Sequence, residues 1–345
     1  MNQRRYQQLL LTRNIKPISW ETQITNSFSI DDLDKEEIIN TVRLGIKENH
    51  IDSSLEGKGV EEILTKFGLI KGDQLLNAAV VLFAKDPGSE YIQCVIRMAR
   101  FKGLTKEIFI DNKQSFGHAF FLLNESENFI RRNTAVSGKI VPGKMKRVDE
   151  PEYPFEAVRE ALINALCHRD YASPGGAITL TIYDDRLEII NTGLLPEGIT
   201  IDQLKINHSS HPRNPNITKV FYRRGLIEEM GMGTQKIIQI CANANMKEPE
   251  FFEQAGTFVI CLWSRSYKSY SDDISLTERQ KKILRLLKEK RRSPRDILYL
   301  LDESITDRTL RNDLQLLKQK GFANSEGQGK QTIWSIISTS GKTRK

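Results

Sequence analysis

The sequence predicts an α+β protein with three parts: an N-terminal α+β region, a central region of alternating helices and strands, and a C-terminal unit of three helices and a hairpin. Helix-type and strand-type hydrophobic spacings both recur along the 345 residues, without an internal repeat. With 39% apolar and 28% charged residues, the chain is neither collagen-like nor wholly disordered. We expect the parts to span residues 1–110, 111–263 and 276–338, with 264–275 as a polar linker.

The N-terminal region carries helix and strand patterns but no catalytic group of residues. Residues 32–49 place apolar side chains at helical spacing behind an acidic first turn, and residues 60–67 predict a second helix. Two apolar runs, 78–84 and 91–99, predict strands joined by a turn at the Asp-Pro-Gly sequence of residues 86–88. We expect this region to serve a structural or assembly role.

The central region alternates helices and strands. Its clearest helix is 154–168, because Pro154 suits a first turn and Val158, Leu162 and Leu166 share one side. The other expected elements are a helix at 115–132, a β-ribbon at 136–148 that turns at Pro142 and Gly143, strands at 177–183, 186–191 and 256–263, a mostly polar stretch at 200–228, and a helix at 233–244.

Three short stretches of the central region carry residues suited to nucleotide chemistry. In the first, EALINALCHRDY, Glu160 and Asn164 are four residues apart and project from one helix face. The Asn164 oxygen could hold Mg²⁺, which prefers hard oxygen ligands. Glu160 could then accept a proton from a nearby water. The alternative is an ordinary amphipathic helix.

The second and third stretches suit a base and a phosphate group. In IINTGLLP a strand ends at Asn191 and turns through Gly193, so a flat ligand could approach the backbone and Asn191 could accept from an exocyclic amine. In MGMGTQKII, Gly231 and Gly233 precede a helix with Thr234 near its cap, which leaves N–H groups for phosphate. Each stretch alone has an ordinary structural explanation, and their order and spacing together favour a nucleotide site.

This order resembles the ATPase superfamily of gyrase, the heat-shock chaperone, histidine kinases and MutL. Its GHKL-type (Bergerat) fold is an α/β sandwich with a mixed, largely antiparallel sheet. More narrowly, the chain is similar to prokaryotic transcriptional regulators often labelled RecG-related, strongly over residues 111–263 and more loosely before them. The stretches that carry the similarity are YPFEAVREALINALCHRDY, IYDDRLEIINTGLLP, HPRNPNITKVF and EMGMGTQKII.

The resemblance implies a role for each matching position. Glu160 takes the place of the water-activating glutamate, Asn164 that of the Mg²⁺-holding asparagine, and Asn191 that of the adenine-reading aspartate. Residues 200–228 correspond to a lid over the nucleotide. The other implied nucleotide contacts are Gly193 in the adenine box, Arg213 and Asn214 in the lid, and Gly231, Gly233 and Thr234 in the phosphate loop. ATP and Mg²⁺ are the implied cofactors.

The sequence also departs from the superfamily pattern. Asn191 is an amide rather than an acid, Leu195 replaces the second glycine of that box, and Cys167 stands where an acidic residue is common; these departures favour nucleotide binding over fast hydrolysis. A Walker-type helicase motor is excluded, because the GKT sequence at 341–343 has Ile336 where the first glycine is required. Family members usually begin with a nucleic-acid-binding domain of the Schlafen/AlbA type, so we expect a short form or a fragment.

The cysteine, histidine and hydropathy patterns indicate the cellular compartment and argue against a zinc site and a membrane span. The cysteines are far apart and lie in apolar patterns, which suits a reducing cytoplasm: Cys94, Cys167, Cys241 and Cys261. The histidines His168, His208 and His211 match no zinc spacing. No apolar run is long enough to cross a membrane, and the first residues lack a secretory signal pattern. We therefore expect a cytoplasmic protein that contacts no membrane.

Basic residues concentrate in the last fifth of the chain. Residues 276–345 hold 17 Lys and Arg against 8 Asp and Glu, a net charge of +9. Since the whole chain carries +7, the other 275 residues together carry −2. This asymmetry favours a nucleic-acid-facing module attached to a nearly neutral body, with a solvated basic tail as the alternative.

The basic segment carries signals for three helices followed by two strands. Thr277 and Gln280 form a capping box, helices are expected from there and over 293–301 and 306–320, and two strands follow at 322–325 and 331–336. This order resembles a winged helix-turn-helix domain, in which the third helix enters the major groove of DNA. The residues expected to face DNA are Arg308, Arg311, Asn312 and Gln315 on the third helix and Lys330 on the wing. A winged helix used for dimerisation is the alternative.

These observations predict an ATP-binding, DNA-binding transcriptional regulator in which Mg-ATP binding tunes the winged helix, with a homodimer as one arrangement. Two alternatives stay open. One is an ATPase subunit of a nucleic-acid-processing or defence system, with Glu160 as general base for slow hydrolysis. The other is a non-catalytic scaffold that kept the fold, which Asn191 and Leu195 favour.

Overall fold

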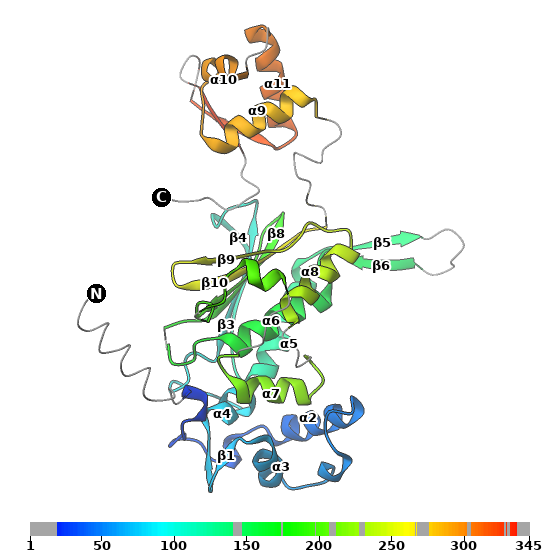
Figure 1. Cartoon of the computed structure of the whole chain (residues 1–345), viewed down its shortest axis with the longest axis vertical. Helices are drawn as coiled ribbons and strands as arrows, with labels where there is room; N and C mark the ends of the chain where they lie inside the picture. Colours follow the sequence, from blue (N-terminus) through cyan, green and yellow to red (C-terminus); the bar gives the residue numbers. More distant parts are fainter. Residues whose placement is uncertain are drawn as a thin grey trace, which may run out of the picture. The chain divides into compact units, whose positions relative to one another are not determined.

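The chain divides into two compact units, Met1–Arg265 and Ser266–Lys345. Figure 1 shows the elements of both. The computed structural model describes residues 19–140, 147–173, 175–196, 198–206, 212–227, 232–265, 267, 276–301, 305–327, 329 and 332–336.

The centre of the first unit is a six-stranded mixed sheet with the strand order β4-β3-β7-β8-β10-β9. Neighbouring strands are antiparallel except β3 and β7, which run parallel with Ile96 opposite Ile178. The strands are β3 (Val95–Lys102), β4 (Ile108–Phe116), β7 (Ile178–Ile182), β8 (Arg186–Thr192), β9 (Glu250–Gln254) and β10 (Thr257–Trp263). The expectation of an α+β fold with a mixed, largely antiparallel sheet is confirmed.

Helices α5 and α6 pack against one face of the sheet, and α8 packs beside α6 (Figure 1). The strand alternation explains this layer: Leu187, Ile189 and Asn191 are the buried residues of β8, and the two apolar ones join the core that contains α6. The helices are α5 (Ala119–Asn133), α6 (Phe155–His168) and α8 (Gly233–Asn243).

The N-terminal elements share this core. They are the 3-10 turns η1 (Trp20–Thr22), η2 (Ile30–Asp32) and η3 (Ser53–Leu55), the helices α2 (Lys35–Lys47), α3 (Val60–Phe67) and α4 (Asn77–Phe83), and the hairpin of β1 (Ile70–Lys71) and β2 (Gln74–Leu75). Helix α7 (Pro215–Arg223), from the central part of the sequence, places Ile217, Val220 and Phe221 in the same core. The amphipathic face of α7 is therefore covered by N-terminal helices.

Glu21 of η1 fixes the start of α7. The residue is fully buried, and its carboxylate accepts from the N–H groups of Asn216 at 2.8 Å and Ile217 at 3.0 Å. A carboxylate at this position satisfies N–H groups that have no partner within the helix. Burial raises the pKa of Glu21, and the two backbone bonds oppose that shift.

The expected boundary at residue 110 is wrong, because it falls inside β4 and separates no domains. β3 precedes that boundary, yet it pairs with both β4 and β7. A single core extends from Leu33 to Leu262. Pairing between residues about eighty positions apart leaves no local pattern in the sequence, which is why the boundary was misplaced.

The strand predicted at 78–84 is wrong, because this run forms helix α4. All seven residues of α4 are buried, so neither hydrophobic period distinguishes a helix from a strand. The helix predicted at 115–132 begins at Ala119, since Ser115 and Phe116 complete β4. The sequence patterns do not predict β1, β2, β4 or β9, and they place the residues of α7 in a mostly polar stretch. The other predicted helices are confirmed within a few residues of their ends.

The predicted ribbon is formed by β5 (Val136–Ile140) and β6 (Arg147–Pro151), while its expected turn at Pro142 and Gly143 lies outside the described residues. Among the helices of the described ranges, none combines the length and the apolar character needed to cross a bilayer.

The described residues of the second unit form three helices followed by a two-stranded sheet, in the order expected for it. They are α9 (Glu278–Glu289), α10 (Pro294–Leu301), α11 (Asp307–Gln319), β11 (Ala323–Glu326) and β12 (Ile333–Ile336). The capping box is confirmed: Gln280 N–H donates to Thr277 Oγ1 at 3.2 Å, and Thr277 N–H donates to Gln280 Oε1 at 3.1 Å. The unit has its own core, made of residues from all three helices with Ala323 and Trp334 of the strands.

Candidate functional site

Helix α6 presents Glu160 and Asn164 one turn apart. The helix begins after Pro154, and the apolar residues around these two positions are buried against the sheet. Glu160 is itself only 6% exposed, and Asn164 Nδ2 donates to Glu160 Oε1 at 3.4 Å. An acid and an amide thus form a polar pair among the buried residues of this helix, which needs a specific reason.

Gly233, the first residue of α8, lies directly against this pair. A Cβ atom added at Gly233 would lie 2.5 Å from Glu160 Oε1 and 3.0 Å from Asn164 Nδ2. The φ angle of Gly233 is not in the left-handed region, so close approach rather than backbone conformation requires a glycine here. Two of the three stretches singled out in the sequence therefore meet, while Gly231 lies outside the described residues.

Asn191 on β8 holds a buried acceptor that lacks a partner. The residue is 4% exposed and lies on the sheet face covered by α6. Its Oδ1 atom has no hydrogen-bond partner within the described part of the chain. Leaving such an acceptor unsatisfied costs about 1–3 kcal/mol. A ligand donor, such as the exocyclic amine expected from the sequence, would remove this cost.

Gly193 joins the end of β8 to the end of α6. Its φ is +121°, and a Cβ there would lie 3.3 Å from the His168 carbonyl oxygen and 3.4 Å from Asp170 N. The Asp170 N–H also donates to the Thr192 carbonyl oxygen at 2.8 Å. Conformation and close approach both explain this glycine. The second stretch is thus held next to the first.

Arg213 covers this junction. Its Nη2 donates to the Leu194 carbonyl oxygen at 3.0 Å, and its Nη1 lies 3.9 Å from Asp170 Oδ2. The guanidinium carbon would be 3.6 Å from a Cβ at Gly193. Because the Arg213 side chain is 38% exposed, it can also reach an anion outside.

Asn214 has a structural role in this arrangement. It is 2% exposed, and its Nδ2 donates to the carbonyl oxygens of Cys167 at 2.9 Å and Arg169 at 2.8 Å. Both carbonyl groups belong to the end of α6 and lack helical partners. Its phosphate contact, implied by the resemblance, is therefore less well supported than that of Arg213.

Thr234 connects α8 to the expected lid. Its hydroxyl donates to the Leu204 carbonyl oxygen at 2.7 Å, within the 3-10 turn η4 (Asp202–Lys205). Helix α7, in the second half of the stretch 200–228 that was expected to form a lid, belongs to the core. The part before α7 is the portion that remains beside the site, and residues 207–211, including His208 and His211, lie outside the described residues.

Two further polar groups near the site were not predicted. Gln235 Nε2 and Thr192 Oγ1 are buried without a hydrogen-bond partner in the described ranges. Thr192 packs against Gly176, where a Cβ would lie 2.3 Å from the threonine methyl group. The only sequence signal was position: Gln235 follows Thr234 and Thr192 follows Asn191.

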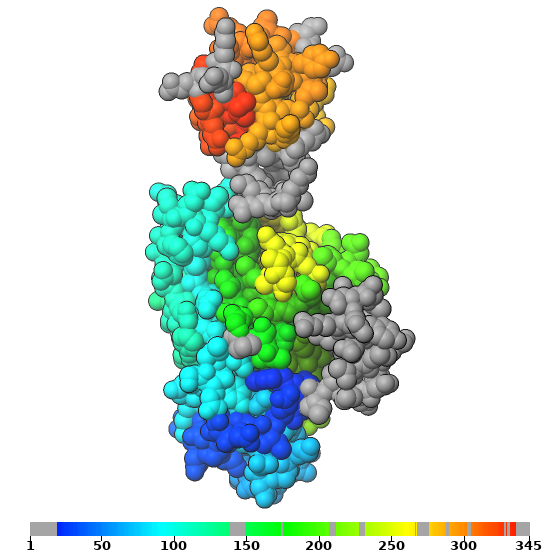
Figure 2. Space-filling model, turned by 90° about the vertical axis from the view of Figure 1, so that its left-hand side faces the viewer, coloured from blue at the N-terminus to red at the C-terminus, as the bar shows by residue number. Residues whose placement is uncertain are grey.

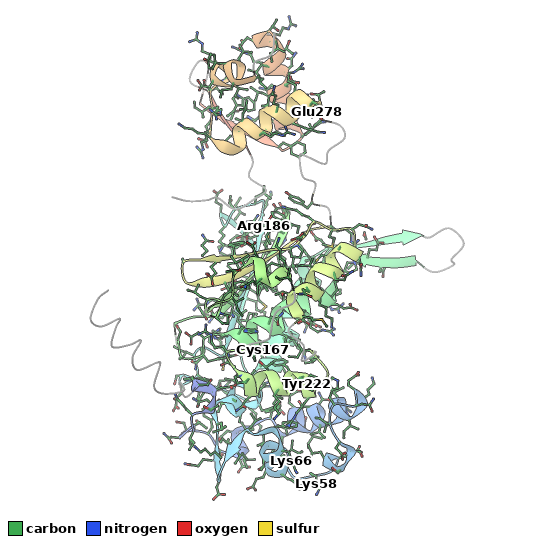
Figure 3. The ribbon with its side chains drawn as sticks, viewed as in Figure 1. Lys58, Lys66, Cys167, Arg186, Tyr222 and Glu278 are labelled. Atoms are coloured by element: carbon green, nitrogen blue, oxygen red, sulfur yellow. The ribbon has the colours of Figure 1, made fainter. Side chains whose placement is uncertain are left out.

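Cys167 does not supply an acid at this site. It lies on α6 in the interior of the first unit (Figure 3) and is 1% exposed. Burial raises the pKa of the thiol to about 12, so it stays neutral. Among the described residues no cluster of three His, Cys, Asp or Glu side chains could hold a metal ion, so a cation here would need amide and ligand oxygens.

Helix α11 of the second unit has one apolar and one polar face. Leu310, Leu314 and Leu317 are fully buried. Buried Asp313 accepts from Arg279 Nε and Gln280 Nε2, both at 2.7 Å, and so fixes α11 against α9. The four α11 residues expected to face DNA are all exposed: Arg308, Arg311, Asn312 and Gln315. Lys330 lies outside the described residues.

Residues 175–262 match the family model HATPase_c_4, described as "Putative ATP-dependent DNA helicase recG C-terminal". The matched segment contains Asn191, Gly193 and Gly233, whereas α6 with its Glu160 and Asn164 precedes it. This segment is thus related to an ATPase-type domain.

One solved structure is similar over most of the chain. It is the DIP2311 protein from Corynebacterium diphtheriae, at 18% sequence identity and a TM-score of 0.60, covering 96% of this chain and 67% of that one. At this identity the similarity shows the fold alone. No curated protein matches the chain.

Proposed function

We propose that this chain binds Mg-ATP between α6, α8 and the end of β8, and that this binding regulates contact between DNA and the second unit. The observation that carries the proposal is the fit of Gly233 against Glu160 and Asn164, beside a strand whose Asn191 holds a buried acceptor without a partner. The relation of residues 175–262 to an ATPase-type domain supports the same assignment.

Each residue has a role that its chemistry allows. The Asn164 oxygen would hold Mg²⁺, which when bound would offset phosphate charge. The first N–H groups of α8, from Gly233 and Thr234, have no helical partners and would bind phosphate oxygens with Gly231. Asn191 Oδ1 would accept from the adenine amino group. Gly193 would hold the β8 turn against the end of α6, beside the base.

Calorimetric titration of Mg-ATP tests the site. Asn164→Ala should weaken Mg²⁺-dependent binding, while Asn40→Ala, which removes an amide from the surface of α2, should bind like the wild type. Asn191→Leu should weaken ATP binding by more than about fivefold, since it removes one hydrogen bond worth about 1 kcal/mol. Absence of ATP binding by the wild-type chain would instead support the scaffold alternative.

DNA binding by the second unit rests on the exposed polar face of α11 and on the +9 charge of residues 276–345. The full chain should retain DNA on filters with an affinity that changes when Mg-ATP is added. Arg308→Ala should lower that affinity and reduce its salt dependence. DNA affinity that is identical with and without Mg-ATP would refute the regulatory part of the proposal.

Glu160 favours a second candidate, slow ATP hydrolysis, because a nucleotide sensor needs no proton acceptor. Its carboxylate lies one turn from Asn164 and could accept a proton from water beside the terminal phosphate. Glu160→Gln keeps the shape of the side chain and should abolish phosphate release while preserving ATP binding. Unchanged phosphate release in this variant would exclude the role of general base.

A further inference from the structure

Strand β4 forms one edge of the six-stranded sheet. Its nine residues, Ile108–Phe116, pair with β3 on one side only, and no strand in the described ranges pairs with the other side. Figure 2 shows the cyan surface of this part of the chain along one margin of the first unit. An edge strand exposes N–H and C=O groups that another strand can bind.

The direction of these backbone groups follows from the pairing with β3. The Gly117 N–H donates to the Cys94 carbonyl oxygen at 3.1 Å, which makes this a hydrogen-bonded pair of the ladder. Because such pairs alternate along antiparallel strands, Asp111, Lys113 and Ser115 bond to β3. Asn112 and Gln114 therefore direct their backbone groups outward, to the open edge.

The same strand exposes large apolar side chains. Ile108, Phe109, Ile110 and Phe116 are each 55–57% exposed. The apolar residues lie at the two ends of the strand, on either side of the polar segment Asp111–Ser115, and exposed apolar residues on an edge strand favour pairing with another chain. The part of the strand from Asp111 to Phe116 pairs regularly with β3, so it can serve as a template.

We propose that two copies of this chain form a homodimer by antiparallel pairing of their β4 strands, with the two-fold axis at Asn112. The sheet then continues from one copy into the other. This inference is independent of the nucleotide site.

The charge order of β4 selects this register. Residues whose backbone N–H and C=O groups face the open edge must lie opposite residues of the same kind in the second copy. Within the regular part of the strand this condition allows two-fold axes at residues 111, 112, 113 or 114. An axis at 111 places Asp111 opposite its own copy, and an axis at 113 does the same for Lys113; both arrangements put like charges together. An axis at 114 places Lys113 opposite Ser115. Only the axis at 112 places Asp111 opposite Lys113 of the second copy, twice by symmetry.

The neighbours of these two residues are compatible with this pairing. On each copy Lys113 forms an ion pair with Glu125 of α5, and Asp111 accepts from Asn133 Nδ2 at 2.8 Å. The Lys113 side chain remains 39% exposed, so it can reach a second carboxylate. The exposed apolar side chains on both sides of the axis would be partly covered by the second copy.

Cysteine cross-linking tests the register. The native cysteines are all buried, at 1–3% exposure, so an added surface cysteine is the reactive one. Asn112→Cys places two thiols at the axis, where the Cα atoms of a hydrogen-bonded pair lie about 5.5 Å apart, a distance that suits a disulfide. Gln114→Cys is the matched control, because it lies on the same exposed face but several residues from its copy. Mild oxidation should give dimers from Asn112→Cys and none from Gln114→Cys.

Light scattering tests the dimer itself. The native full chain should have the mass of two chains, and Ile110→Lys should weaken association by more than about tenfold because it adds a charge to the joined edge. Ile39→Lys is the control, since Ile39 is 54% exposed on α2, and it should remain dimeric. A native chain that is monomeric at every concentration, or equal cross-linking at positions 112 and 114, would overturn the proposal.

Discussion

Replacing Gly233 by alanine should separate ligand binding from folding. The new methyl group would lie 2.5 Å from Glu160 Oε1, closer than a Cβ atom tolerates, so the Glu160 carboxylate must move. Overpacking of this kind costs about 1–3 kcal/mol. Because the proposed site needs the Glu160 carboxylate in its present position when Mg-ATP is bound, this cost should weaken Mg-ATP binding by about 5- to 150-fold.

The effect on folding should be small or opposite in sign. The φ of Gly233 suits any residue, and alanine favours a helix over glycine by up to about 1 kcal/mol. The displaced atom is also the end of a flexible side chain, which can turn away in the absence of ligand. The free energy of unfolding should therefore stay constant or rise slightly.

Two measurements decide the matter: urea denaturation for stability and calorimetric titration for Mg-ATP. Gly59→Ala is the matched control, since Gly59 caps α3 with an ordinary φ and a Cβ there would meet no atom within 4 Å. A Gly233→Ala protein that binds Mg-ATP as well as the wild type would refute the assignment of this contact to the site. A protein that loses ligand binding together with stability would show a structural contact instead.

Three further predictions concern the fold. Asn214→Ala should destabilise the first unit by about 1–3 kcal/mol in urea denaturation, because the Arg169 carbonyl oxygen loses its donor and the Cys167 carbonyl oxygen keeps only the backbone N–H of residue 214. Burial lowers the pKa of His118, so stability should be lost as the pH falls below about 6.5. His118→Asn keeps the acceptor for the Phe121 N–H and should remove that loss between about pH 7.5 and pH 5.5; an unchanged slope would assign it to other groups. Leu314→Ala should lower the free energy of unfolding by about 2–5 kcal/mol and make the second unit unfold before the first. The fluorescence of Trp334, which lies in the same core as Leu314, measures this unfolding.

The local elements could be predicted because each carries its own signal. Pro154 and the apolar spacing behind it mark α6, and the Thr277–Gln280 box marks α9. The prediction of a strand at 78–84 failed because the residues of this run are buried on every side, so their hydrophobicity has neither the helical nor the strand period. Local patterns therefore identify elements with one polar face and fail for elements without one.

The candidate site was predictable only in its residue types. Glu160 and Asn164 share a helix face by simple spacing, which any reader of the sequence can derive. The contact of Gly233 with this pair depends on how α8 packs beside α6, and the unpartnered oxygen of Asn191 depends on what surrounds β8. Such properties arise from tertiary packing, and no single stretch contains them.

The insertion of α7 among the N-terminal helices limits how this protein can be shortened. A truncated chain beginning at residue 111 would lose β3, and with it the link between β4 and β7. It would also leave Ile217, Val220 and Phe221 facing water and take away the Glu21 carboxylate that secures their helix. A shortened protein for crystallisation or screening of the ATPase-type segment should therefore keep the first unit from Trp20 to Arg265. The chain can be cut between the two units instead.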